Sequence, residues 1–529
     1  MRQFHSYGPV DSQEHFYVER NELIDKCRQQ LIGNPKKDGH FFTIWAPRQA
    51  GKTWLMRQVK KEIERLYPDQ FKIGMMSVQG VVMKDEEPDE LFLKKLGLLF
   101  WETFQVKLDH QPETWEDFKL LFTSAYNLFN SRLILFIDEF DSLPPKVIDR
   151  LVTLFRDIYL KRENYLIHGL ALIGVRAVLG VASHRGSPFN IQRSLHVPNF
   201  TKEEVQDLFQ QYQTEINQKI EPEVVETVYD VTRGQPGLVG WFGELLTETY
   251  NPVKDKVIDL EQWKDVYRLS CHVEWNNTVL NLIKKAKGEY LYHIIELFSR
   301  SDIAFSLDAE WCSYCYLNGI IDFQTEISPN GIKLEVCRFS SPFIQLRLYN
   351  ALTYDFIGDR FPILAIEPLD RLSDVFEGTE FNLPSLLNRY KSYLKRLKAK
   401  GLNPWKEQPR RADLHITEAV GHFHLYAWLH QVIGRICVIS PEFPTGNGRV
   451  DVHVKCGDKK GIIEVKSFID RLAVEKSKKQ AADYALKLGL HAVTIAMFVP
   501  VEDEDVLAQL TDEVNIQGVR VNTVAIGWT

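Results

Sequence analysis

Short apolar runs alternate with helical patterns in the first part of the chain. The apolar runs, which are typical of strands buried on both faces, are residues 41–45, 133–137 and 166–175. After the first run, Leu55, Val59 and Ile63 recur at helical spacing. This alternation predicts an α/β fold with a parallel sheet.

Three further patterns follow along the chain. Thr201 and Glu204 form a capping box at the start of a helical region. Residues 266–360 alternate short helical patterns with a hairpin-like piece around 327–331, which favours a winged-helix module. Residues 414–499 predict a helix, three strands, a second helix and a further strand. Because 529 residues exceed what one core holds, we expect about two to four domains.

The first apolar run leads into a loop whose residue types suit phosphate binding. It consists of Ala46, Pro47, Arg48, Gln49, Ala50, Gly51, Lys52 and Thr53. This is the pattern G-x-x-x-x-G-K-[ST] with Ala46 in place of the first glycine, a change that a negative φ tolerates. In such a loop, main-chain N–H groups and the positive helix end hold a triphosphate. We predict that the loop binds ATP, with Lys52 on the β and γ oxygens and Thr53 on Mg²⁺. A chance Gly-Lys-Thr on a surface turn is the alternative.

Two carboxylates follow the second apolar run, where a buried parallel strand would present them at its carboxyl edge. We predict that Asp138 holds Mg²⁺ and that Glu139 polarises the attacking water. The alternative is a core strand that ends in an acidic turn before Pro144.

Together with Gly234-Gln235-Pro236, these segments resemble the AAA-like and STAND branch of P-loop ATPases over about residues 15–255. The resemblance implies a nucleotide fold followed by a helical lid, with Gln235 and Pro236 near the nucleotide. It also implies that the lead at residues 15–31 lies near the adenine. Such proteins look like switches more than motors.

The same resemblance implies a γ-phosphate sensor at Arg176, directly after the third apolar run. Arg185 and Arg193 are further candidates for a charge-stabilising arginine. For each of the three, the alternative of equal weight is an ordinary surface or salt-bridged residue. The winged-helix module either relays the switch or binds DNA, and its lack of a concentrated basic face favours the relay.

Charge is unevenly spread along the chain. The net charge is −7, but Lys and Arg outnumber Asp and Glu from Leu383 onward, which favours a polyanion as partner of the C-terminal third. A helical stripe there is formed by Leu387, Tyr390, Leu394 and Leu397. Nucleic-acid contact is predicted for basic residues around the end of this stripe, which are Lys395, Arg396, Lys398 and Lys400. A solvated helix face is the alternative.

A second set of chemical residues lies on two predicted strands. Asp451 belongs to one strand, and Glu464 and Lys466 lie on one face of the next. Carboxylates from adjacent strands can meet one hard cation. We predict that Asp451, Glu464 and the carbonyl of Val465 hold Mg²⁺ or Mn²⁺, while Lys466 orients or deprotonates water for attack on a phosphodiester.

The segments Gly448-x-x-Asp451, Glu464-x-Lys466 and Gln480-x-x-x-Tyr484 closely resemble the RecB-like branch of PD-(D/E)XK nucleases, over about residues 383–529. The resemblance implies a further metal contact from Glu418, and Gln480 with Tyr484 beside the catalytic site. A nuclease fold kept only for docking is the alternative. The histidines of the first helix do not share one face at ligand spacing, so we interpret them as packing or solvent residues; they are His422, His424 and His430.

The cysteines and the apolar segments bear on location. Seven cysteines, an odd number scattered over a long chain, predict reduced thiols and a cytoplasmic protein. Neither the start of the chain nor any apolar stretch has the length and purity of a membrane span. We expect no membrane partner, and we leave open a homo-oligomer and a protein trigger.

The combined prediction is a multidomain α/β protein. Its parts are a P-loop ATPase core (1–200), a helical lid (201–265), a winged-helix-like module (266–365) and a PD-(D/E)XK nuclease domain with a basic leading helix (366–529). The predicted function is an ATP-binding and ATP-hydrolysing switch that controls a Mg²⁺-dependent nuclease. We predict DNA as the substrate, with RNA as the alternative. The predicted setting is defence against foreign nucleic acid or its processing. The alternatives are a nucleotide-gated sensor whose nuclease fold only binds, and a DNA-translocating ATPase with an accessory nuclease.

Overall fold

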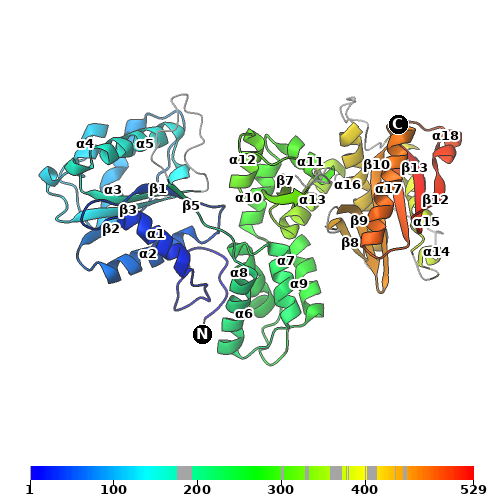
Figure 1. Cartoon of the computed structure of the whole chain (residues 1–529), viewed down its shortest axis with the longest axis horizontal. Coiled ribbons are helices and arrows are strands. Elements are labelled where there is room, and N and C mark those ends of the chain that lie inside the picture. The colour runs from blue at the N-terminus through cyan, green and yellow to red at the C-terminus, as the bar shows by residue number, and fades with distance from the viewer. Residues whose placement is uncertain are drawn as a thin grey trace. The chain divides into compact units, whose positions relative to one another are not determined.

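The computed structural model (Figure 1) divides into two compact units. The first comprises Met1–Thr278 and Ser313–Ile320, and the second comprises Val279–Cys312 and Ile321–Thr529. The structure describes residues 2–174, 193–299, 303–327, 333–357, 372–376, 378, 381–399, 401, 405, 414–434, 437–444 and 449–528. The predictions for Arg176, Arg185, Lys400 and Gly448 fall outside the described residues.

A five-stranded parallel sheet forms the centre of the first unit. Its strands lie in the order β2-β3-β4-β1-β5, and every neighbouring pair is parallel. Their bounds are β1 (Phe41–Trp45), β2 (Phe71–Ser77), β3 (Arg132–Asp138), β4 (Ile167–Gly174) and β5 (Arg193–His196). Three of these strands coincide with the predicted apolar runs, so the predicted α/β fold with a parallel sheet is confirmed.

Helices cover both faces of this sheet (Figure 1). Along β3, Leu133, Leu135 and Ile137 join one core cluster, while Ile134 and Phe136 join the other. Because side chains alternate along a strand and both faces are buried, the strand is a continuous apolar run. The helices over the first cluster are α3 (Leu96–Phe104), α4 (Trp115–Leu120) and α5 (Pro145–Leu160), and those over the second are α1 (Asn21–Ile32) and α2 (Lys52–Leu66).

Four further helices follow the sheet in the first unit. They are α6 (Lys202–Ile216), α7 (Pro222–Thr232), α8 (Pro236–Glu244), which continues as a π-helical turn (Leu245–Thr249), and α9 (Leu260–His272). The predicted capping box is confirmed, because the Thr201 side chain accepts from the Glu204 N–H and the Glu204 side chain accepts from the Thr201 N–H. Short 3₁₀ turns lie at η1 (Asp89–Lys95), η2 (Ser124–Tyr126), η3 (Phe140–Ser142) and η4 (Arg162–Asn164).

The middle of the chain contains helices and one hairpin. The elements are α10 (Asn277–Ala286), α11 (Leu291–Ser299), α12 (Glu310–Leu317), β6 (Ile321–Ile327), β7 (Lys333–Phe339) and α13 (Pro342–Ile357). β6 and β7 pair antiparallel from Ile321 opposite Phe339 to Ile327 opposite Lys333. The predicted hairpin is therefore confirmed.

A separate six-stranded mixed sheet forms the centre of the second unit. Its order is β12-β13-β11-β10-β9-β8, with β10, β11 and β13 parallel to one another and the remaining pairs antiparallel. The strands are β8 (Val438–Pro444), β9 (Arg449–Cys456), β10 (Lys459–Ser467), β11 (Ala492–Val499), β12 (Asp512–Ile516) and β13 (Val519–Gly527). The helices are α14 (Ser373–Phe376), α15 (Leu383–Ala399), α16 (Leu414–Ile433), α17 (Arg471–Lys487) and α18 (Glu504–Leu510). This confirms the predicted order of elements over residues 414–499.

The cysteines depart from the prediction at one place. Cys437 and Cys456 form a disulfide, so the prediction that all thiols are reduced is wrong for this pair. Cys437 precedes β8 and Cys456 ends β9, and the antiparallel register places Val438 opposite Lys455. The two cysteines are 19 residues apart along the chain, so it is the strand register that brings their sulfurs together. The other five cysteines are buried and form no disulfide.

No helix within the described ranges has both the length and the apolar content needed to cross a membrane.

Candidate functional site

The loop after β1 brings a lysine and a threonine to the edge of the first sheet. Gly51 has φ 85°, a left-handed conformation that favours glycine, and it forms the N-cap from which α2 begins at Lys52. Ala46 is buried and is not among the positive-φ residues, so the missing first glycine is tolerated as expected. The Lys52 ammonium donates to the carbonyls of Ala46 and Pro47, each at 2.8 Å.

The carboxyl end of β3 supplies the acidic partners. The Thr53 hydroxyl donates to Asp138 Oδ2 at 2.9 Å, and the Glu139 N–H donates to Asp138 Oδ1 at 2.9 Å. Glu139 itself has φ 56°, a left-handed conformation that costs energy in a residue other than glycine. The structure therefore brings the predicted pair of Thr53 and Asp138 together.

Burial shifts the pKa values of two groups at this edge. Desolvation lowers the pKa of Lys52, although the nearby Glu139, Asp141 and Asp138 each act to raise it. Desolvation, reinforced by the charge of Asp138, raises the pKa of Glu139, while Lys52 acts to lower it. Acidic and basic groups are thus held in a partly dry setting, where electrostatic interactions are stronger than in water.

The N-terminus of α8 contacts the loop directly. Gln235 Nε2 donates to the Arg48 carbonyl at 3.1 Å, and the Gly237 N–H donates to the Gln49 carbonyl at 3.1 Å. The other end of the Gln235 side chain accepts from the Leu238 N–H and caps α8, whose first residue is Pro236. The structure therefore places Gln235 and Pro236 at the phosphate-binding loop.

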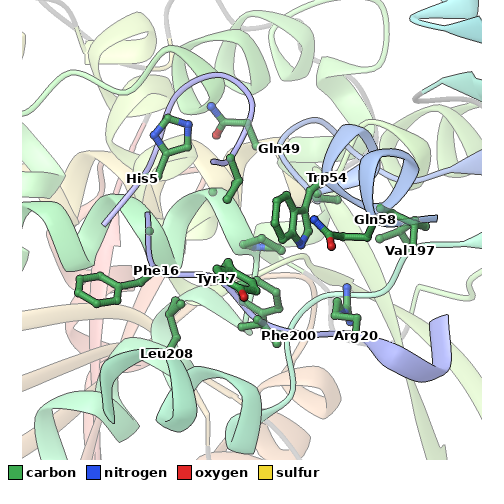
Figure 2. Close-up of a pocket in the computed structure, with 18 of the residues that line it drawn as sticks. His5, Phe16, Tyr17, Arg20, Gln49, Trp54, Gln58, Val197, Phe200 and Leu208 are labelled. Atoms are coloured by element: carbon green, nitrogen blue, oxygen red, sulfur yellow. The ribbon is translucent and has the colours of Figure 1, made fainter. Parts of the chain in front are cut away.

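A mostly apolar cavity of ≈ 130 Å³ lies beside the loop (Figure 2). Tyr17 and Trp54 pack at 5.0 Å between ring centroids and both line it. Two buried side-chain amide atoms at the cavity, Gln49 Oε1 and Gln58 Nε2, have no hydrogen-bond partner. The remaining lining residues shown by label are His5, Phe16, Arg20, Val197, Phe200 and Leu208. An apolar slot with a few unsatisfied polar atoms suits a flat heteroaromatic ring.

Sequence reasoning found only part of this cavity. The lead at residues 15–31 contributes Phe16, Tyr17 and Arg20, as the resemblance implied. The segment before it was missed, although Gln49 Nε2 donates to the Ser6 carbonyl at 3.1 Å and His5 lines the cavity. Val197 and Phe200 were also missed. No spacing in the sequence joins these segments, because they meet only through the sheet and the lid.

In the second unit, three carboxylates converge on one ammonium group. Lys466 Nζ lies 3.2 Å from Asp451 Oδ2, 3.5 Å from Glu464 Oε2 and 3.8 Å from Glu418 Oε1. Asp451 comes from β9, Lys466 and Glu464 from β10, and Glu418 from α16. The structure thus brings together the predicted acidic residues and the predicted lysine.

Main-chain groups fix the same carboxylates. The Val465 N–H donates to Asp451 Oδ2 at 2.6 Å, and the Ser467 N–H donates to Glu418 Oε2 at 3.0 Å. Glu464 is buried, and its Oε1 has no hydrogen-bond partner. The structure shows the Val465 N–H in use, while a role for its carbonyl stays a prediction.

The electrostatics of this cluster follow from burial and from like charges. Burial, together with the charge of Asp451, raises the pKa of Glu464 to about 8. Burial opposes the charged form of Lys466, but Asp451, Glu418 and Glu464 hold its pKa well above the usual value. Within the described ranges, no three or more His, Cys, Asp or Glu side chains are arranged to hold a metal ion. The Lys466 ammonium is the cation among these carboxylates.

Gln480 and Tyr484 lie one turn apart on α17. Gln480 Nε2 donates to the Tyr484 hydroxyl at 2.7 Å. Burial raises the pKa of Tyr484; the charge of Glu464 adds to the rise, whereas the Gln480 hydrogen bond and the charge of Lys466 oppose it, so Tyr484 interacts electrostatically with the cluster.

Comparisons with known proteins found similar solved structures and one family model. Similar solved structures include the Walker-type ATPase PABY2304 of Pyrococcus abyssi, with 13% identity and a TM-score of 0.44 over 65% of this chain and 99% of that one. The Aeropyrum pernix ORC1 protein in complex with DNA has 13% identity and a TM-score of 0.36 over 64% and 93%. The Thermotoga maritima RuvB Holliday junction branch migration motor has 17% identity and a TM-score of 0.33 over 60% and 92%. A comparison with curated proteins finds no match.

A family model described as "AAA-like domain" matches residues 5–268. Residues 5–268 are an AAA-like domain. This match includes the phosphate-binding loop, Asp138, Glu139, the cavity and the α8 contact. It also covers the segment from His5 to residue 14, which the resemblance in the sequence had left out.

The basic residues of α15 are partly engaged. The predicted apolar stripe of this helix is confirmed, because Leu387, Tyr390, Leu394 and Leu397 are all buried. Lys395 pairs with Glu504 at 2.6 Å, and Lys398 pairs with Glu502 at 3.3 Å and donates to the Gly527 carbonyl at 2.9 Å. Arg396 lies 5.9 Å from the Tyr393 ring centre. Exposed ion pairs are weak, so nucleic-acid contact by this helix stays a prediction that requires these pairs to open.

The contact between α8 and the loop of the AAA-like domain can be tested at Gly237. A Cβ atom there would lie 2.4 Å from Gln49 Oε1 and 2.6 Å from Gln49 Cβ. Gly237→Ala should therefore displace Gln49, destabilise the domain by about 1–3 kcal/mol through overpacking, and weaken ATP binding. Thermal unfolding and equilibrium ATP binding measure both effects. Gly80→Ala is the control, because a Cβ at Gly80 meets open space; equal behaviour of the two variants would contradict a tight contact.

Proposed function

We propose that this chain is an ATP-dependent switch that controls a Mg²⁺-dependent nuclease. The observation that supports the nucleotide part is the assembled edge of the AAA-like domain, where Thr53 contacts Asp138 and Lys52 lies in the loop beside an apolar cavity. The observation that supports the nuclease part is the convergence of three carboxylates on Lys466.

In the first unit, the adenine ring of ATP would occupy the cavity next to Tyr17 and Trp54, and the phosphates would meet the N–H groups of the loop. Thr53 and Asp138 would hold Mg²⁺, which neutralises phosphate charge when bound. Lys52 would exchange its two carbonyl acceptors for phosphate oxygens. Glu139, directly after β3, would orient water, and Gln235 would link the predicted lid to the state of the loop through its bond to the Arg48 carbonyl.

In the second unit, a buried carboxylate oxygen, Glu464 Oε1, is the feature that suits a metal ion. A buried carboxylate oxygen without a partner is costly, and a cation is one of the few groups that would satisfy it. After displacement of the Lys466 ammonium from among them, Asp451, Glu464, Glu418 and the Val465 carbonyl would draw together and hold Mg²⁺ or Mn²⁺, which lowers the negative charge facing a phosphodiester. Lys466 would orient the attacking water.

The supporting residues of this second site act on position. Gln480 holds the Tyr484 hydroxyl beside the cluster, and the Val465 N–H holds Asp451. We further propose that the helices α10 to α13 and the β6–β7 hairpin form a winged-helix-like relay of the STAND type between the two activities. The proposed substrate is DNA, with RNA as the alternative, and the proposed setting is defence against foreign nucleic acid or its processing.

A second candidate function is a nucleotide-gated sensor whose nuclease fold only binds. Its support is the engagement of Lys466 with all three carboxylates, which closes the cluster upon itself. Cleavage of plasmid DNA with Mn²⁺, compared with EDTA, separates the two functions. Absence of cleavage with intact DNA binding would favour the sensor.

Lys52→Ala should abolish ATP binding, because it removes the ammonium that meets the phosphates, and it should leave the fold intact. Fluorescent ATP binding and circular dichroism measure the two effects. Lys60→Ala is the matched control, because Lys60 lies on the same helix in a surface pair with Glu64 at 3.8 Å. Undiminished ATP binding by Lys52→Ala would refute the assignment.

Asp451→Asn and Lys466→Ala should each reduce cleavage to background, since one weakens the cation site and the other removes the group that orients water. ATP turnover should survive in both, because neither residue belongs to the AAA-like domain. Lys460→Ala, an exposed change on the same strand β10, should cleave like wild type. Retained cleavage by Asp451→Asn would rule out this nuclease site.

Coupling between the two activities requires a third comparison. Cleavage rates of wild type, Lys52→Ala and Glu139→Gln, each with and without ATP, should differ, because a switch works only if its nucleotide states differ in how they present the nuclease. We expect ATP binding to matter more than hydrolysis, so Glu139→Gln with ATP should resemble the activated wild type. Identical rates in all six conditions would show two independent activities on one chain.

A further inference from the structure

A buried histidine links the carboxylate cluster to the neighbouring helix α13. His422 Nε2 lies 2.9 Å from the main-chain oxygen of Asp451. A carbonyl oxygen can only accept, so Nε2 carries the proton and donates. On the other side of the ring, the Tyr349 hydroxyl donates to the His422 main-chain oxygen at 3.2 Å and lies 3.4 Å from Nδ1. His422 and Tyr349 are both buried.

His422 contacts β9 where the pairing with β10 has ended, while β9 still pairs with β8 on its other edge as far as Arg449. The pairing of β9 with β10 runs from Cys456 to Val452, which lies opposite Ile463, so Asp451 is one residue beyond the last pair. Its side chain is nevertheless held at 2.6 Å by the Val465 N–H of β10. Asp451 is thus fixed at both ends, by Val465 through the carboxylate and by His422 through the main chain.

Helix α16 provides the mechanical connection. It bears Glu418, which faces the cluster, and His422 one turn later. Its next residue, Phe423, packs against Tyr349 of α13 at 4.6 Å and against Phe298 of α11 at 5.6 Å between ring centroids. A shift of α13 would therefore reach the support of Asp451 through packed, buried groups.

We propose that His422 is a positioning residue for Asp451, and that Tyr349 makes this support depend on the position of α13. The inference rests on the proposed function of the cluster as a cation site. Loss of the His422 donor would let Asp451 relax away from Val465 and would weaken the ligand set without removing a ligand. Groups that orient ligands in this way commonly change metal affinity about 10–100-fold.

The same helix offers a matched control. His424 is also buried and also bonds a buried tyrosine, with Nδ1 2.7 Å from the Tyr390 hydroxyl. Burial lowers the pKa of both histidines, that of His424 to about 3. The two histidines therefore match in helix, burial and partner type. They differ in that His422 is bonded to the main chain of Asp451, whereas His424 is bonded to Tyr390.

The test uses the full chain with His422→Leu, His422→Gln, His424→Leu and Tyr349→Phe. Amide hydrogen exchange at Val465 in metal-free protein measures the stability of the hydrogen bond from the Val465 N–H to the Asp451 carboxylate. Calorimetric titration with Mn²⁺ measures cation affinity. His422→Leu should speed Val465 exchange and weaken Mn²⁺ binding by about 10-fold or more. His422→Gln, whose amide can still donate to the Asp451 carbonyl, should restore both to within about 3-fold. His424→Leu should change neither, whatever its effect on thermal stability.

Each result decides between explanations. Equal Val465 exchange in His422→Leu and His424→Leu would overturn the proposal. Mn²⁺ binding lost as completely in His422→Gln as in His422→Leu would also overturn it, because His422 would then be a direct ligand. Wild type that binds no Mn²⁺ would refute the metal site, while Val465 exchange would still judge the support of Asp451.

Tyr349→Phe keeps the ring and removes only the hydroxyl, so it is expected to fold even if His422→Leu does not. It should speed Val465 exchange several-fold and weaken Mn²⁺ binding to a smaller extent than His422→Leu. Wild-type values in both measurements would remove α13 from the proposal.

Discussion

A parallel sheet buried on both faces leaves the ends of its strands as the place where polar side chains can act. In the first unit, Lys52 and Thr53 follow β1, and Asp138 closes β3. In the second unit, Glu464 and Lys466 lie near the carboxyl end of β10, which is parallel to β11. Both candidate sites therefore follow from one constraint. The helices that cover the sheets supply the remaining groups from outside.

Both sites contain a buried lysine whose charge is satisfied by the protein itself. Lys52 donates to two main-chain carbonyls, and Lys466 lies among three carboxylates. A buried ammonium without partners would cost several kcal/mol, so these contacts stabilise the folded chain before any ligand arrives. Under the proposed function, ligand binding is then an exchange of partners. Neutral carbonyls release an ammonium more readily than carboxylates do, which makes the second site the more tightly closed of the two.

Helix α16 combines packing and chemistry in the second unit. Its faces bear Glu418 and His422 toward the cluster and Phe423 toward α11 and α13. Because protein cores are closely packed, a displacement of one element is passed to its neighbours instead of being absorbed. A displacement of α13 should for this reason be passed through the packed core to Asp451.

The sequence by itself determined what depends on local pattern: the strands at the three apolar runs, the loop before Lys52, the Thr201 capping box and the order of elements over residues 414–499. It also placed Glu464 and Lys466 together, since alternation along a strand fixes which side chains share a face, whereas Glu418 was implied by the resemblance to RecB-like nucleases. Only the tertiary structure decided which distant segments meet: His5 with the loop, His422 with Asp451, and the two cysteines of the disulfide. Those contacts depend on strand register and helix packing, which arise from the whole core and leave no periodic trace in the chain.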